Sequence, residues 1–89
     1  MKTRTTTIHD SRYQSVIKRV TELRKLAGLS QKEIAHAIGV SQSDISKVER
    51  CERRLDVIEL YDVLWVVVGQ DQHLFDIYLK EVYEAFRRS

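Results

Sequence analysis

The segment SQKEIAHAIGVSQSDISKVERC, residues 30–51, contains two short helical patterns that are separated by a tight turn. Gly39 lies between the two patterns, at a position where a glycine adopts a positive φ without steric cost. The small side chain of Ala35 permits the two helices to approach closely and to cross at a steep angle. The residues predicted to form their shared core recur at helical spacing and are Ile34, Ala35, Ile38, Val40, Ile45 and Val48.

Polar residues mark the beginning of each of these two helices. Ser30 and Glu33 have the spacing of a capping box, in which each side chain accepts a hydrogen bond from the backbone N–H of the other residue. Ser41 is a predicted N-cap residue of the second helix, and Asp44 lies in the first turn of that helix. Residues 30–51 are therefore predicted to form a helix-turn-helix motif whose second helix ends near residue 50 or 51.

Three further helices are predicted around this motif, at residues 11–27, 56–68 and 71–87. The chain has 89 residues, three glycines and no proline, so we expect residues 11–89 to form one all-α domain of five helices. Residues 1–10 are polar and without periodicity, and they are predicted to form a flexible N-terminal arm. The predicted start and stop signals of the outer helices are Ser11 with Gln14, Asp56 with Glu59, Asp71, Gly28 and Gly69.

The two helices beyond residue 56 carry more apolar surface than one buried face requires. In the first of them, one stripe is predicted to close the core and a second stripe, offset by about 100°, needs another partner. These stripes are Val57, Leu60, Leu64 and Val67, and Ile58, Tyr61, Trp65 and Val68. We expect a symmetric dimer interface, and the alternative is that one monomer buries both stripes. The predicted anchors of the dimer are Trp65, Tyr78, Val82 and Phe86.

The net charge of +2 conceals an asymmetry between the two halves of the chain. Residues 1–55 contain twelve basic and six acidic residues, a net charge of +6, whereas residues 56–89 contain three basic and seven acidic residues, a net charge of −4. A basic first half indicates contact with a polyanion, and random scatter of solvated charge is the alternative.

The segment LRKLAGLSQKEIAHAIGVSQSDISKVERCERRLDVIEL resembles the XRE-type helix-turn-helix family of lambda repressor and Cro. The resemblance covers roughly residues 13–69 and rests on a Leu-Ser-Gln opening followed in order by Ala35, Gly39, Ile45, Val48 and Glu49. It implies a five-helix, lambda-repressor-like DNA-binding domain with a C-terminal dimerisation helix. It also implies that the second helix of the motif lies in the major groove of double-stranded DNA.

The resemblance assigns functional roles by position. The base-reading positions are Gln42, Ser43, Ser46 and Lys47. A glutamine amide suits adenine and a lysine ammonium suits guanine, which agrees with this assignment. The positions implied to contact the DNA backbone are Gln31, Lys32, Ser41, Arg50, Arg53 and Arg54, with Arg24 as a weaker candidate. Glu49 is predicted to touch DNA or to make a structural hydrogen bond or ion pair.

Two further positions bear on how the chain meets DNA. The family often has glycine where Cys51 stands, so here a residue with a Cβ must make the bend, and the path of the following Arg53–Arg54 loop is open. The family also often has proline nearby, where this chain has Leu55 and Asp56. Lys2 and Arg4 suit either a disordered tail or an arm that reaches a minor groove.

The sequence favours a dimeric, sequence-specific DNA-binding transcriptional regulator that binds an inverted repeat. The alternative is an antitoxin-like or other protein-interaction module whose main partner is another protein. No metal-ligand spacing, nucleophile–base pair or phosphate-binding loop is present, so we expect no enzyme, cofactor, metal or small-molecule ligand. The single Cys51 is predicted to be an inert thiol, and a cytoplasmic chain without membrane spans or a signal peptide is expected.

Overall fold

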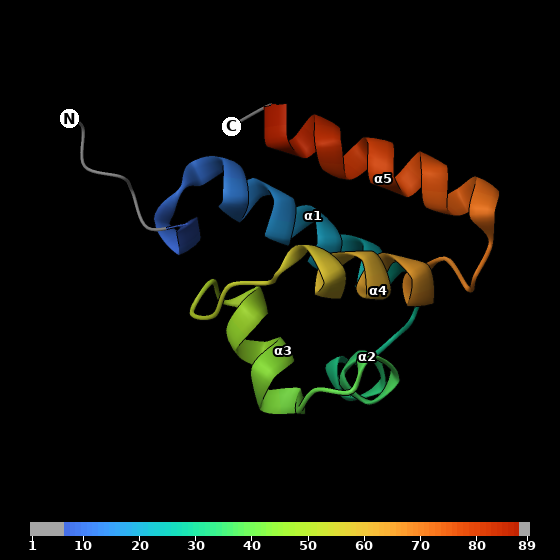
Figure 1. Ribbon diagram of the computed structural model, residues 1–89, viewed down its shortest axis with the longest axis horizontal. Helices are drawn as coiled ribbons and strands as arrows, with labels where there is room; N and C mark the ends of the chain where they lie inside the picture. The colour runs from blue at the N-terminus through green and yellow to red at the C-terminus, as the bar shows by residue number, and fades with distance from the viewer. Residues whose placement is uncertain (1–6, 88–89) are drawn as a thin grey trace.

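The computed structural model describes residues 7–87 (Figure 1). These residues form a 3₁₀ turn, Thr7–His9, followed by α1 (Ser11–Leu26), α2 (Gln31–Ile38), α3 (Gln42–Glu49), α4 (Val57–Val67) and α5 (Gln72–Arg87). The prediction of an all-α fold with five helices is confirmed, and the helix ends agree to within one or two residues. The predicted roles of Lys2 and Arg4 fall outside the described residues.

The beginning of α1 differs from the prediction. Asp10 is the N-cap residue, and its carboxylate accepts a hydrogen bond of 2.8 Å from the backbone N–H of Arg12. Gln14 donates instead to the carbonyl of Ile8 at 3.1 Å, so the predicted capping box of Ser11 and Gln14 is wrong. The 3₁₀ turn and the Asp10 cap occupy the last four residues of the predicted arm and lead into α1, and the flexibility of the arm stays a prediction.

The end of α3 is a left-handed turn at Cys51, where φ is 57°. The N–H of Cys51 bonds the carbonyl of Val48 at 2.9 Å, and the N–H of Glu52 bonds the carbonyl of Lys47 at 2.8 Å. This pair of bonds is a Schellman motif, which glycine usually provides. The chain therefore makes the bend with a residue that carries a Cβ and accepts the steric cost of that conformation.

The core lies where α1, α2, α3 and α4 meet, and one face of α5 completes it. Leu23 of α1, Ile34 of α2 and Leu64 of α4 are its most buried large side chains. The predicted motif core is confirmed: Ile34, Ala35, Ile45 and Val48 are buried, and Ile38 and Val40 pack against them. α2 and α3 are thus held as one unit beneath α1 and α4 (Figure 1).

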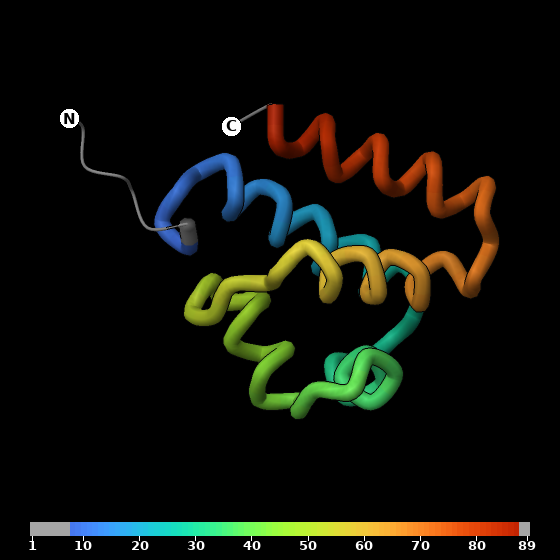
Figure 2. Tube along the Cα trace, viewed as in Figure 1, coloured from blue at the N-terminus to red at the C-terminus, as the bar shows by residue number. Residues whose placement is uncertain are grey.

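α5 packs chiefly along α1 and separates from α4 beyond the turn that joins them (Figures 1 and 2). Val57, at the first residue of α4, is consequently 75% exposed, and the prediction that it closes the core is wrong. The N-terminal end of α4 is thus more exposed than its other end, where Val68 is buried.

The predicted dimer anchors are not equivalent in the fold. Val82 is buried in the core of the monomer at 5% exposure, which leaves little of its side chain for a second copy, and its role in a dimer interface stays a prediction. The reason is that α5 uses the face containing Phe75 and Val82 to cover its own domain. Trp65 and Tyr78 are half-buried against the same core, and only Phe86 among the four is substantially exposed, at 44%.

Candidate nucleic-acid interface

The turn between α2 and α3 is fixed by its backbone and by the cap of α3. Gly39 has φ of 79°, and the N–H of Val40 bonds the carbonyl of Ala35 at 3.0 Å. Ser41 Oγ then accepts the N–H of Asp44 at 3.0 Å, and the Asp44 carboxylate accepts the N–H of Ser41. A capping box of Ser30 and Glu33 begins α2 in the same way. The two helices of the motif therefore have defined N-termini and a defined angle.

The outer face of α3 presents polar side chains to solvent. Gln42, Ser43 and Lys47 are exposed and, within residues 7–87, make no side-chain hydrogen bond or ion pair. Ser46 is half-buried and its Oγ accepts a hydrogen bond from Arg50 Nη1, which leaves the hydroxyl proton to donate elsewhere. Three of the four predicted base-reading side chains are thus available together on one face of the helix.

A buried ion pair ties the C-terminal end of α3 to α1 and α2. The Arg24 guanidinium donates to both oxygens of Glu49, with Nε–Oε2 at 2.6 Å and Nη2–Oε1 at 2.9 Å, and also to the carbonyl of Leu29 at 2.7 Å. Gln31 Nε2 donates to Glu49 Oε1 at 2.9 Å. The alternative in which Glu49 makes a structural ion pair is therefore confirmed, and Arg24, which is 8% exposed, is wrongly predicted as a DNA contact.

The remaining backbone-contact candidates fall into two groups. Lys32, Ser41 and Arg54 are exposed at the N-terminus of α2, the N-terminus of α3 and the loop after α3. Arg50 and Arg53 already have acidic partners, because Arg50 pairs with Glu52 at 3.0 Å and Arg53 pairs with Glu59 at 2.9 Å. The protein therefore neutralises two of the predicted cations internally.

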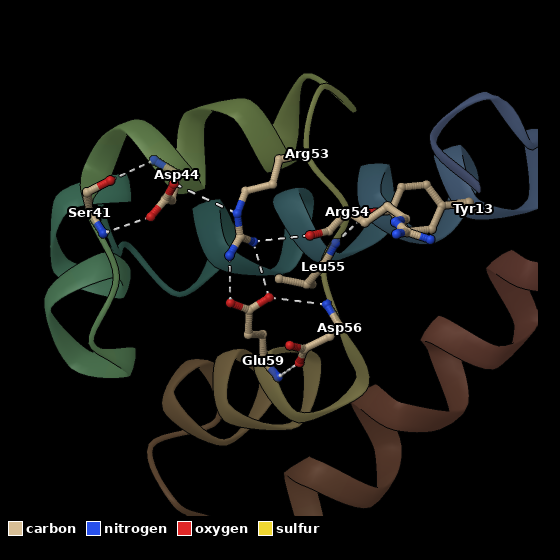
Figure 3. Close-up of polar contacts among 8 residues, drawn as sticks. All are labelled: Tyr13, Ser41, Asp44, Arg53, Arg54, Leu55, Asp56 and Glu59. Carbon is tan, nitrogen blue, oxygen red and sulfur yellow. Dashed lines mark hydrogen bonds and ion pairs between the residues drawn. The ribbon is translucent and has the colours of Figure 1, made fainter. Parts of the chain in front are cut away.

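The loop from α3 to α4 is held by contacts at successive residues (Figure 3). Arg53 donates to both oxygens of Glu59, at 3.2 and 2.9 Å, and to the carbonyl of Arg54 at 3.1 Å. Tyr13 of α1 accepts the N–H of Leu55 at 2.8 Å through its hydroxyl. The hydrogen bond from Arg53 lowers the pKa of Glu59, and burial is the largest influence that raises the pKa of Tyr13. This loop has a defined path, which answers the question left open by Cys51.

Comparison with protein families matches residues 20–64 to the helix-turn-helix family. The matched segment spans half of the chain and contains α2, α3 and most of α4. The chain belongs to the XRE-type helix-turn-helix family. A search of curated proteins found no match.

As an XRE-type helix-turn-helix protein, the chain is a DNA-binding regulator with double-stranded DNA as its partner. The family is a regulatory one and is not typically enzymatic. None of the helices within residues 7–87 has the length and apolar character needed to cross a membrane.

Sequence reasoning missed several contacts of this helix-turn-helix domain. The hydroxyl of Tyr13 and the N–H of Leu55 are 42 positions apart in the chain, and no local pattern pairs them. The same holds for Arg53, whose sequence neighbours suggested only a basic loop. Asp44 and Glu59 were recognisable as cap residues at the third position of their helices, but nothing in their spacing showed that both face one arginine.

Proposed function

We propose that this XRE-type protein is a homodimeric transcriptional regulator that reads an inverted repeat in double-stranded DNA, most often as a repressor. The observation that carries the proposal is the exposed set Gln42, Ser43 and Lys47 on one face of a helix whose N-terminus is capped and whose C-terminus is fixed in the core. Side chains at the N-terminal end of such a helix reach base edges when the helix enters the major groove.

The N-termini of α2 and α3 supply the sequence-independent part of the interface. Free backbone N–H groups and the helix dipole at both ends favour a phosphate oxygen. Gln31, Lys32 and Ser41 lie at these two ends, and each retains a donor: the second amide N–H of Gln31, the ammonium of Lys32 and the hydroxyl proton of Ser41. Arg50 and Arg54 extend this set beyond the far end of α3, and Ser46 stays a candidate base reader.

Selection of bound sites from a random duplex pool tests the base-reading proposal. We expect an enriched sequence with two inverted half-sites, and loss of discrimination at one or two positions in the variant Gln42→Ala. Lys32→Gln is the matched control, because a phosphate contact weakens binding to all sequences alike and reduces the salt slope by about 1. Equal loss on selected and scrambled duplexes for Gln42→Ala would contradict its role as a base reader.

An apolar groove between α1, α4 and α5 is the proposed dimer surface. It contains two hollows of about 550 and 560 Å³ that share Val16, Leu60 and Phe86 as lining residues. Val57 lines it from α4, and Leu79 and Tyr83 line it from α5. The groove exists because α5 diverges from α4, and Val82, although mostly buried, is one of its lining residues.

The exposed apolar surface of α4 and α5 suits a second copy of the chain. Val57, Leu79, Tyr83 and Phe86 line the groove and are each between 44% and 75% exposed, and Ile58 and Tyr61 on α4, outside the groove, are exposed to a similar degree. With about 150–250 Å² for a whole aromatic side chain, these residues expose on the order of 600 Å². That is the upper end for the largest patch of a monomer and approaches the roughly 800 Å² per partner of a stable interface.

Sedimentation or light scattering tests the dimer. We expect wild type to form a species of twice the 10.5 kDa chain mass and Tyr83→Glu to remain monomeric, because a charge in the apolar interface is not compensated. Leu26→Glu is the matched control, since Leu26 is 71% exposed and does not line the groove. A wild type that stays monomeric at micromolar concentration, with and without DNA, would remove the dimer from the proposal.

The same groove favours one alternative function, an antitoxin-like or other protein-interaction module. In that case the groove binds another protein and DNA binding is secondary. Titration of duplex DNA at several salt concentrations separates the two functions, because a DNA-binding protein loses affinity steeply as salt rises. A flat salt response, or no binding to any duplex, would favour the interaction module.

A further inference from the structure

Arg53 lies between two carboxylates that belong to different helices (Figure 3). Its Nη1 and Nη2 atoms donate to both oxygens of Glu59 in the first turn of α4, and its Nε atom is 3.8 Å from Asp44 Oδ1 in the first turn of α3. We call this set of Asp44, Arg53 and Glu59 the Arg53 bridge. It connects the base-reading end of α3 directly to α4.

Few N–H groups of Arg53 remain to donate a hydrogen bond to a phosphate. A guanidinium has five N–H groups. Three hydrogen bonds run from Arg53 to Glu59 and to the carbonyl of Arg54, and Nε faces Asp44. The bridge also holds two carboxylates for one guanidinium, so its net charge is −1 and it offers a phosphate group no excess of positive charge.

The position of the bridge along α3 allows it to control where the base-reading side chains lie. α3 has eight residues and is therefore about 12 Å long. The backbone of Arg53 follows the C-terminal end of α3, but its guanidinium lies beside Asp44 at the opposite end. Gln42 and Ser43 immediately precede Asp44, so a shift of Asp44 displaces both of these side chains.

Each partner of Arg53 is itself fixed. Asp44 caps Ser41, while Glu59 Oε1 also accepts the N–H of Asp56 at 3.1 Å. The side chain of Glu59 is 18% exposed and that of Arg53 is 34% exposed, so solvent screens this pair less than a fully exposed one. The bridge is therefore hydrogen-bonded at Glu59, and at Asp44, whose side chain is 39% exposed, it is an ion pair of 3.8 Å.

We propose that Arg53 is a positioning residue for sequence-specific binding, which holds the N-terminal turn of α3 against α4 and does not clamp the DNA backbone. This inference rests on the proposed function, because it concerns how α3 is presented to DNA. The adjacent Arg54 serves as the backbone contact of this loop, since it is exposed and, within residues 7–87, its side chain has no acidic partner. The two neighbouring arginines thus have different roles.

The variants Arg53→Gln and Glu59→Gln test the bridge, and Arg54→Gln is the matched control. Affinity is measured for the duplex selected by wild type and for a scrambled duplex of the same composition, across a salt series. Arg53→Gln and Glu59→Gln are each expected to reduce the ratio of the two affinities by at least about fivefold, the lower range of one lost bidentate base contact, with the salt slope unchanged. Arg54→Gln is expected to weaken both duplexes alike and to reduce the slope by about 1.

A phosphate-clamping Arg53 gives the opposite pattern. Arg53→Gln would then weaken both duplexes alike with a reduced salt slope, and Glu59→Gln would strengthen both because it releases the cation. Either result would overturn the proposal. Arg53→Lys adds a second comparison, because lysine keeps the charge but lacks the planar fork. Our account predicts a lowered affinity ratio for this variant, and the phosphate account predicts unchanged binding.

Stability measurements without DNA separate folding effects from positioning. Glu59→Gln retains an oxygen for the N–H of Asp56, so α4 keeps its cap. Circular dichroism is expected to show that the variants are folded. The double variant Arg53→Gln/Glu59→Gln is expected to lose no more unfolding free energy than the less stable of the two single variants, because both substitutions remove the same contact. If wild type prefers no duplex, the proposed function fails. If wild type has a preference that Arg53→Gln retains in full, the positioning role alone fails.

Discussion

Replacing Arg24 by methionine removes one partner of a buried ion pair and leaves the Glu49 carboxylate with Gln31 as its remaining side-chain donor. The side chains of Arg24 and Glu49 are only 9% and 14% exposed. Loss of one partner from a buried pair costs about 3–5 kcal/mol. Since a small part of this pair remains in water, we expect the lower end, about 3 kcal/mol of unfolding free energy.

For a domain of this size, each kcal/mol lowers the melting temperature by roughly 4–8 °C, so Arg24→Met is expected to melt roughly 12–24 °C below wild type. Urea denaturation followed by circular dichroism gives the free energy directly. The stability of such a domain is only about 5–15 kcal/mol, and the variant therefore loses a large fraction of it.

Two comparisons make the expectation for Arg24 specific. The double variant Arg24→Met/Glu49→Leu is expected to recover most of the loss, because replacement of both members of a buried pair by apolar side chains is often neutral. Glu52→Gln breaks the exposed pair with Arg50 and is expected to leave the unfolding free energy nearly unchanged, because solvent screens an exposed pair. A loss below about 1 kcal/mol for Arg24→Met, or a double variant as unstable as the single one, would refute the reasoning.

Three other expected outcomes follow from local contacts. Cys51→Gly is expected to raise the unfolding free energy by about 0.5–1 kcal/mol, because it relieves the steric cost of a Cβ in the left-handed conformation and this gain exceeds the added entropy of the unfolded chain. Cys51→Ala keeps the Cβ and is expected to leave the unfolding free energy unchanged. Equal stability of wild type and both variants would contradict this. Tyr13→Phe is expected to cost about 1 kcal/mol and to speed amide exchange at Leu55, and unaltered exchange would show that the hydroxyl contributes nothing. The pKa of Glu59 lies below its ordinary value of 4.5 in the folded chain, so its ionised form stabilises the fold. The difference in unfolding free energy between wild type and Glu59→Gln is therefore expected to be largest above pH 4.5 and to decline as the pH falls through the lowered pKa of Glu59. A difference that does not change with pH in urea denaturation would count against the contact with Arg53.

The sequence by itself determined most of the local structure of this protein, with the N-terminal cap of α1 as the exception. The capping boxes at Ser30, Ser41 and Asp56 and the turn at Gly39 were all predictable, because each signal joins residues no more than about four positions apart. The periodicity of the apolar residues also identified the core of the motif. The roles of Gln42, Ser43 and Lys47 as base readers stay a prediction, supported by their position and exposure.

The tertiary structure alone decided which charged and apolar side chains are already occupied. Arg24 pairs with Glu49 from 25 positions away, and Arg53 turns to Glu59 rather than outward. The direction of α5 exposes Val57 and buries Val82. Such contacts depend on where whole helices lie relative to one another. Helical periodicity identifies the face on which a side chain lies, but only the packing of the helices determines what that face meets.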